Sequence, residues 1–204
     1  MNNTYTGYTE KTPEHLLLDA GAFFKNFDMQ KDTFETAVSD GKLIGATRGG
    51  GEFSATPTIR KIEIDGIKGR AKGMSRLDEW EAYIKANVLE VTEETIKAAL
   101  CAANVSETYE KYKTFEGKND IELDDYIENV TWIGTLSGSG EPVVIQVFNA
   151  LNTDGLKVTT QDKNEGVLAM TFYGHYDDPK KPPFAIHYPK AETATASTGE
   201  GTTE

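Results

Sequence analysis

The densest group of side chains that could bind a metal ion or take part in catalysis is a run of carboxylates over residues 120–128. Its acidic members are Asp120, Glu122, Asp124, Asp125 and Glu128. Carboxylate oxygens are preferred ligands of Ca²⁺, so the run would suit a calcium site. It lacks the glycine and the terminal glutamate of an EF-hand loop, however, and acids that face water beside a strand explain it better. We therefore expect no metal site here.

The residues that could act as metal ligands or nucleophiles are scattered. His15, His175 and His187 are far apart in sequence and have no metal-ligand spacing. Ser139 lies between two glycines after a strand-like stretch, without the context of a nucleophile elbow. Cys101 is the only cysteine and lies among alanines, so we expect a small buried side chain and no intrachain disulfide. The sequence therefore predicts no catalytic residues.

Two glycine-rich stretches, at 45–51 and 66–73, are candidates for cofactor binding. The first lacks the Lys-Ser/Thr pair of a phosphate loop, and the second has the wrong spacing for a dinucleotide-binding fold. We interpret both as turns and expect no cofactor. A glycosidase with paired carboxylates stays open, because such pairs form in space, but nothing in the sequence supports one.

Alternating hydrophobicity and turn signals predict mainly β-strands around these residues. The longest alternation covers 78–91, with Trp80 on its apolar face. A buried strand with a bend at Gly21 is expected over 15–28. A short strand at 42–47 should end at the glycines 49–51. Further strands are expected at 58–65, 107–115, 126–136, 143–151, 155–160, 167–176 and 184–188.

Two segments have helical signals. Residues 93–103 follow Thr92 as a cap, begin with two acids and carry apolar residues at helical spacing. A shorter helix is expected over 32–39, with Asp32 as its N-cap and Gly41 after its end. Together the elements predict a β-sandwich or barrel with a flanking α-helix over 14–189. An N-terminal arm over 1–13 and a Thr-, Ala- and Gly-rich tail over 190–204, expected to be flexible, would flank it.

Composition narrows the class of function. The 204 residues include 33 acids and 21 basic residues, for a formal net charge of −12, which argues against attractive binding to nucleic acid. The 38 % hydrophobic content is sufficient for a folded core. No apolar stretch reaches the roughly 18 to 20 residues that span a bilayer, and the start has no secretory signal, so we expect a cytosol-like compartment.

Two charged features are more informative. Residues 66–76 carry four cations and no acid between two expected strands; the cations are Lys68, Arg70, Lys72 and Arg76. This segment is either a solvated hairpin loop or an arm that docks on another copy of the chain. The polar face of the 78–91 strand carries Glu79, Glu81, Tyr83, Lys85 and Asn87. That face is either plain surface or the lining of a wet channel.

The order of these motifs resembles the major tail proteins, or tail tube proteins, of long-tailed bacteriophages of the non-contractile type. The likeness covers about residues 14–189. It is carried by Gly51-Glu-Phe53, Ile62-Glu-Ile-Asp-Gly66, the alternating strand 78–91, the helix 93–103, Phe172-Tyr-Gly-His-Tyr-Asp177 and Pro183-Phe-Ala-Ile-His-Tyr188.

The resemblance implies a structural virion protein without enzymatic activity. Such β-sandwiches close into homohexameric rings in which one sheet per subunit joins a shared inner β-barrel, and the rings stack into the tube that conducts genome DNA. The segment 66–76 would reach the neighbouring ring, and the polar face of 78–91 would line the lumen. The implied partners are further copies, the tape measure, tail terminator and distal tail proteins, and DNA as transiting cargo. The implied location is the phage tail, after assembly in the host cytoplasm.

A role as a tube wall around DNA would explain the negative net charge. Six copies at −12 each would give a ring a formal charge of −72, and a mostly acidic wall repels phosphates so that DNA can slip past. The alternative is a soluble β-sandwich binding module of the carbohydrate-binding or adhesin type. Trp80, Trp132 and Tyr173 exposed on one flat face would favour that alternative.

Overall fold

The computed structural model describes residues 6–190, and within this range the chain is mainly β. Its strands are β1 (Leu17–Lys25), β2 (Thr47–Lys61), β3 (Ser75–Val88), β4 (Ala103–Tyr109), β5 (Tyr112–Gly117), β6 (Ile127–Leu136), β7 (Val143–Asn152), β8 (Lys157–Gln161), β9 (Asn164–Tyr173) and β10 (Phe184–His187). Its helices are α1 (Phe34–Ser39), α2 (Glu93–Ala99) and the short 3-10 turns η1 (Thr12–Glu14) and η2 (Leu123–Asp125). The start of the expected N-terminal arm (1–5) and the expected tail from 191 onward lie outside the described residues.

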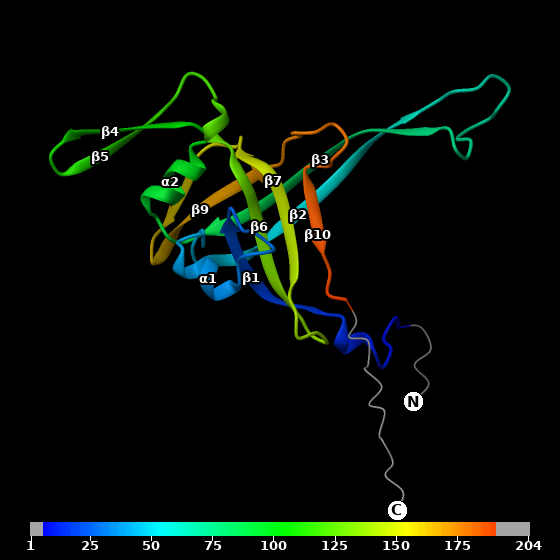
Figure 1. Ribbon diagram of the computed structural model, residues 1–204, viewed down its shortest axis with the longest axis horizontal. Helices are drawn as coiled ribbons and strands as arrows, with labels where there is room; N and C mark the ends of the chain where they lie inside the picture. The colour runs from blue at the N-terminus through cyan, green and yellow to red at the C-terminus, as the bar shows by residue number, and fades with distance from the viewer. Residues whose placement is uncertain (1–5, 191–204) are drawn as a thin grey trace, which may run out of the picture.

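Eight strands form one antiparallel sheet that folds over into two layers. The strand order is β1-β6-β7-β9-β3-β2, with β10 beside β7 and β8 beside β9. Strand β7 pairs with β6 along most of its length, and its last residues, Leu151 and Asn152, pair with β9. Figure 1 shows the layer of β1, β6, β7 and β10 crossing over β2, β3 and β9. The expected β-sandwich is confirmed.

The core lies between these two layers. Phe23 of β1 and Val147 of β7 come from one layer, and Ile84 of β3 and Phe172 of β9 from the other; none is more than 1 % exposed. Burying such side chains supplies the main driving force for folding. A second, smaller cluster on the outer face of the layer of β1, β6 and β7 packs Phe24, Ile133 and Val144 against Phe27 and against Ala37 of α1. The layer of β2, β3 and β9 therefore has the polar outer face.

The alternation expected over 78–91 is confirmed in β3. Ala82, Ile84, Ala86 and Val88 are buried, whereas Tyr83, Lys85 and Asn87 between them are half-buried. Because successive side chains of a strand point to opposite faces, β3 has one core face and one outer face. The strand begins three residues earlier than expected and ends three residues earlier.

The glycines at 49–51 lie inside β2 and do not end a strand, contrary to expectation. The two positive-φ glycines, Gly49 and Gly50, fall within an irregularity of the β2–β3 ladder. A side chain at Gly51 would collide with the ring of Phe23 and with the backbone carbonyl of Lys85 in β3. Glycine is required here because Phe23 packs against the bare backbone of β2.

Two expected strands are wrong. The stretch 42–47 forms a single bridge, between Leu43 and Phe24, before β2 begins. The stretch 107–115 is the middle of a hairpin, β4–β5, that turns at Glu110 and Lys111 and forms a separate sheet. That turn contains no glycine, asparagine or proline, so the usual turn signal is missing.

Both expected helices exist, but each is shorter than expected: α1 begins two residues later and α2 ends four residues earlier. Helix α2 has the expected cap, since Thr92 and Thr95 form a capping box, but it ends at Ala99, shortly before the left-handed residue Cys101 (φ 70°). Helix α1 is capped by Thr33. The expected cap, Asp32, instead accepts hydrogen bonds from Lys42 and the backbone N–H of Asp28. No helix within residues 6–190 has the length and apolar character to cross a bilayer.

Candidate assembly surfaces

The outer face of β2, β3 and β9 is a continuous polar surface, here called the polar sheet face. Cross-strand partners in an antiparallel ladder share a face, so the register assigns its members. Glu52 lies opposite Lys85, and Tyr83 lies opposite both Ser54 and Tyr173. Its members are Glu52, Ser54, Thr56, Thr58, Glu79, Glu81, Tyr83, Lys85, Asn87, Tyr173, Ala169 and the buried Thr171. The five β3 residues expected on a polar face therefore lie side by side.

Hydrogen bonds and ring contacts order the middle of this face. The Tyr83 hydroxyl donates a 2.6 Å hydrogen bond to Glu52, and the Tyr83 and Tyr173 ring centroids are 5.5 Å apart. The hydrogen bond to the Glu52 carboxylate raises the pKa of Tyr83, and burial raises the pKa of Tyr173. Further along, the Thr58 hydroxyl donates to Glu79 at 3.3 Å.

The polar sheet face carries more negative than positive charge. Glu52, Glu79 and Glu81 supply three carboxylates, and Lys85 supplies the one ammonium group among its members. Glu79 and Glu81 are exposed, whereas Lys85 is half-buried. This surface repels a polyanion more strongly than it attracts one.

The β2 side of this face was missed from the sequence. Glu52, Ser54, Thr56 and Thr58 alternate with the half-buried Phe53, Ala55 and Pro57, so a period-two signal exists. The preceding glycines and Pro57, both unfavourable in a strand interior, hid that signal.

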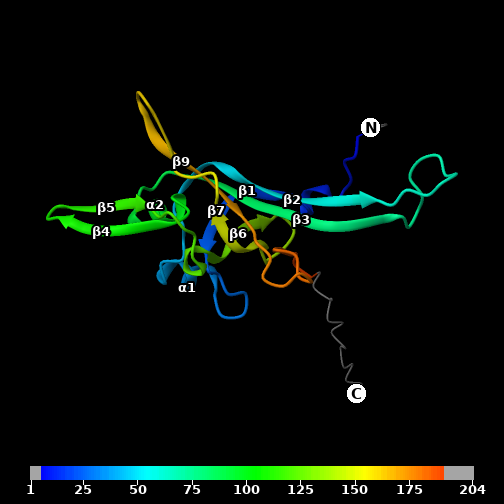
Figure 2. The same cartoon turned by 90° about the horizontal axis from the view of Figure 1, so that it is seen from above.

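Beyond the core, β2 and β3 continue into a long projecting hairpin, and residues 61–76 at its end are here called the basic arm (Figures 1 and 2). Lys68, Arg70, Lys72 and Arg76 are all exposed. Among the described residues none of these four side chains forms an ion pair, and Arg76 donates only to nearby backbone carbonyls, those of Gly73 and Ser75. The four cations that the sequence analysis singled out therefore lie together on one solvent-exposed projection.

The same hairpin exposes apolar side chains. Ile59 and Leu77 lie opposite each other in the ladder and are 60 % and 53 % exposed. Towards the tip, Ile64 and Ile67 are 40 % and 50 % exposed. No other described part of the chain covers these four side chains fully, so much of their apolar surface is exposed to water. Exposed apolar surface of this kind is typical of a site that contacts another molecule.

The layer that carries the polar sheet face has two unpaired margins. Among the described strands β2 pairs only with β3, and β8 pairs only with β9. The free edge of β2 belongs to a 15-residue strand, about three times the usual length. An exposed edge of this length presents a row of backbone groups that can pair with another chain.

One lysine forms ion pairs with two carboxylates of the run at 120–128. The ammonium group of Lys118 lies 2.8 Å from both Glu122 and Asp125. These pairs raise the pKa of Lys118 and lower the pKa of Asp125. No cluster of three or more metal-ligating side chains exists among residues 6–190.

The other chemical candidates are separated from one another. His175 contacts the carbonyl oxygen of Asn149 at 2.9 Å. Cys101 is half-buried, and burial raises the pKa of its thiol. Ser139 accepts a hydrogen bond from the backbone N–H of Glu141 in the turn after β6. These contacts stabilise turns and loops.

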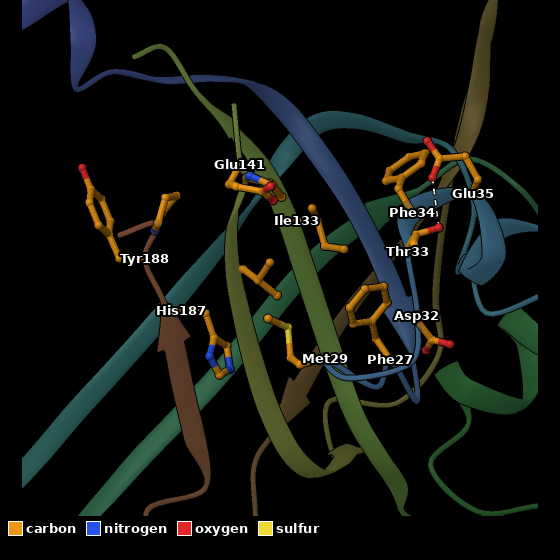
Figure 3. Close-up of a pocket in the computed structure, with 13 residues that line it drawn as sticks. Phe27, Met29, Asp32, Thr33, Phe34, Glu35, Ile133, Glu141, His187 and Tyr188 are labelled. Atoms are coloured by element: carbon orange, nitrogen blue, oxygen red, sulfur yellow. Dashed lines mark hydrogen bonds between the residues drawn. The ribbon is translucent and has the colours of Figure 1, made fainter. Parts of the chain in front are cut away.

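The third histidine, His187, lies at the margin of a surface pocket of about 560 Å³ (Figure 3). Phe27 and Ile133 line its apolar part, and Glu35 and Glu141 are among its polar residues. His187 is 3.2 Å from the amide oxygen of the buried Gln146. Of the hydrogen bonds between described residues, none joins His187 to a carboxylate.

The three aromatics that would mark a binding module do not share an exposed face. Trp80 stacks edge-on against Phe184 at 5.4 Å, and Trp132 donates its indole N–H to the Ala20 carbonyl. Both pack towards the core, whereas Tyr173 lies on the polar sheet face, and all three are half-buried.

Comparisons with known proteins identify no family for this chain. No family model matches the sequence, and no curated protein matches it. Among solved structures, the tail of an empty GTA particle with C6 symmetry is similar at a TM-score of 0.41 and 11 % identity, covering 84 % of this chain and 96 % of that chain.

Proposed function

We propose that this protein is a non-enzymatic structural subunit of a bacteriophage tail tube, which assembles into stacked hexameric rings around a channel for genome DNA. The observation that carries the proposal is the β2–β3 pair. Its strands of 15 and 14 residues form much of the polar sheet face, leave the β2 edge unpaired and continue into the basic arm. The sequence resemblance over residues 14–189 supports the same function.

Ring closure accounts for the unpaired margins. In the proposed ring, the β2 edge of one copy meets the β8 margin of the next, so that the polar layers join into one inner barrel. Such a contact is heterologous and closes when the rotation between copies divides a full turn. It also covers edges that would promote aggregation of an isolated copy.

The polar sheet face then forms the wall of the channel. Its surplus of carboxylates over the single Lys85 disfavours phosphate binding, so DNA passes without being held. The basic arm reaches the neighbouring ring, and tape measure, tail terminator and distal tail proteins are the proposed partners at the tube's centre and ends.

Electron microscopy of the assembled protein tests the proposal. Negative-stain images of purified protein or of its virion should show stacked rings with a central channel. The proposal is wrong if the protein stays strictly monomeric at high concentration, in salt that screens repulsion and with the tail-assembly factors present.

Labelling tests which face lines the channel. Glu81→Cys in a Cys101→Ser background should react in tubes with a small maleimide but not with one attached to a polymer too large for the channel. Glu35→Cys, on exposed helix α1, is the control and should react with both reagents. Equal reaction of Glu81→Cys with both reagents would place the polar sheet face outside the channel.

A further inference from the structure

The tip of the basic arm is both apolar and cationic. Ile67, which is 50 % exposed, directly precedes the run that carries the exposed cations Lys68, Arg70 and Lys72. Ile64, which is 40 % exposed, lies between Asp65 and Glu63, and Glu63 pairs with Lys61. Among the described residues Lys68, Arg70 and Lys72 have no ion-pair partner. A surface that matches this tip must offer exposed apolar groups beside unpaired acids.

The chain itself carries such a surface in residues 119–125, here called the acidic loop. Leu123 is 88 % exposed and Ile121 is 55 % exposed, and both alternate with acids. Glu122 and Asp125 are paired with Lys118, whereas Asp120 and Asp124 form no ion pair among the described residues. The loop therefore presents two large aliphatic side chains between two unpaired carboxylates.

The acidic loop is held in shape. Leu123–Asp125 form the turn η2, and the backbone N–H of Glu122 donates to the Asp125 carboxylate at 2.8 Å. The backbone N–H of Lys118 donates a 3.1 Å hydrogen bond to the Ala102 carbonyl. This bond fixes the loop at the base of the β4–β5 hairpin. A preorganised surface loses less entropy on binding.

The two complementary surfaces lie towards opposite ends of the molecule. The basic arm and the β4–β5 hairpin project in opposite directions in both views (Figures 1 and 2). One chain therefore cannot join its own arm to its own acidic loop, but copies arranged head to tail bring the two together.

We propose that the basic-arm tip of one copy docks on the acidic loop of a second copy. In this contact Ile64 and Ile67 cover Ile121 and Leu123, and the arm cations face Asp120 and Asp124. The contact is heterologous, so it repeats from ring to ring without closing. The inference rests on the proposed tube function and adds the surface on which the arm lands.

Disulfide trapping tests the contact. Ile67→Cys with Leu123→Cys, in a Cys101→Ser background, should give a ladder of covalent oligomers when assembled tubes are oxidised. Ile67→Cys with Val158→Cys is the matched control, because Val158 in β8 is also 56 % exposed, and it should give little ladder. Intact tubes with no ladder, or with equal ladders from both pairs, would overturn the docking contact while leaving the tube function standing. A chain with native Cys101 that forms no rings, at high concentration, in screening salt and with the tail-assembly factors present, would instead overturn the tube function, and the docking contact with it.

Charge exchange provides a second test. Lys68→Glu with Lys72→Glu, and separately Asp120→Lys with Asp124→Lys, should each raise the concentration needed for tube formation by about tenfold or more. All four substitutions together should restore much of the assembly, as measured by sedimentation, with circular dichroism reporting the fold. A combined variant that assembles no better than either pair would overturn the inference.

Discussion

Tyr83 and Glu52 are joined across the β2–β3 ladder by a 2.6 Å hydrogen bond, although neither lies directly opposite the other in the register. The contact is diagonal and couples the two long strands on their outer face. Because its donor is a phenol and its acceptor a carboxylate, it is sensitive to alkaline pH.

Alkaline titration should reveal this bond. The pKa of Tyr83 lies above the ordinary value of 10.0, so the bond stabilises the fold below that pH, and its contribution is lost as the pH rises through the folded-state pKa. Glu52→Gln should lower the pKa of Tyr83, and Tyr83→Phe should remove one late-titrating phenol, measured by ultraviolet difference absorbance. The exposed Tyr109→Phe serves as control and should leave that late component in place.

Glu79→Lys with Glu81→Lys should permit assembly and slow DNA release by about tenfold or more, because the added cations would bind passing phosphates. Infectivity and DNA ejection rates measure the effect. Asp40→Lys with Glu10→Lys makes the same charge change at exposed positions off the polar sheet face, and should be tolerated. Unimpaired ejection by the first variant would remove both residues from the channel wall.

Replacing the four basic-arm cations by serine should leave the fold intact and weaken ring stacking, since all four are exposed and none supports the core. The substitutions are Lys68→Ser, Arg70→Ser, Lys72→Ser and Arg76→Ser. Tube length and salt resistance are the measurements. Serine at four exposed lysines outside the proposed contacts, Lys11, Lys111, Lys180 and Lys181, is the matched control. Tubes of unchanged length and salt resistance from the arm variant would show that the arm is plain surface.

Gly51→Ala should lower the free energy of unfolding by about 1–3 kcal/mol, because the new methyl group would press on the buried Phe23 ring. Urea denaturation measures this loss. Gly117→Ala is the control, because no atom lies within 4 Å of its added methyl group. Phe23→Leu in the Gly51→Ala chain should recover the part of the loss that comes from the Phe23 ring. A fully additive loss would show that the clash with the Lys85 carbonyl accounts for it, and not the ring.

Acid should loosen the acidic loop. Lys118 holds the pKa of Asp125 below its ordinary 3.8, so this pair stabilises the loop above that pH, and the contribution is lost as the pH falls through the folded-state pKa. Lys118→Met should speed amide hydrogen exchange over 118–126 several-fold at neutral pH. Lys111→Met, at the hairpin turn, should not. Unchanged exchange in the first variant would show that the loop is held by other contacts.

The sequence predicts this structure best where a local pattern and the tertiary contacts agree. The strict alternation of β3 and the Thr92 cap of α2 depend on a few neighbouring residues, and both are confirmed. The polar β3 residues that form part of the candidate assembly surface followed from the same alternation. Their use as a channel wall stays a prediction.

The failures have non-local causes. Gly51 lies within a strand because the ring of Phe23, distant in sequence, packs on it, and no local rule reveals that contact. The hairpin at Glu110 and Lys111 turns without glycine or proline, so its two strands were read as one. The position of Glu52 on the polar sheet face depended on pairing with β3, which only the fold establishes.

The opposite placement of the basic arm and the acidic loop gives any head-to-tail assembly of this chain a direction. One end would expose unoccupied arms with their four cations, and the other would expose unoccupied acidic loops with Leu123 and the carboxylates of Asp120 and Asp124. A factor that starts growth and a factor that stops it would thus meet surfaces of opposite sign. Each could recognise its own end by charge alone.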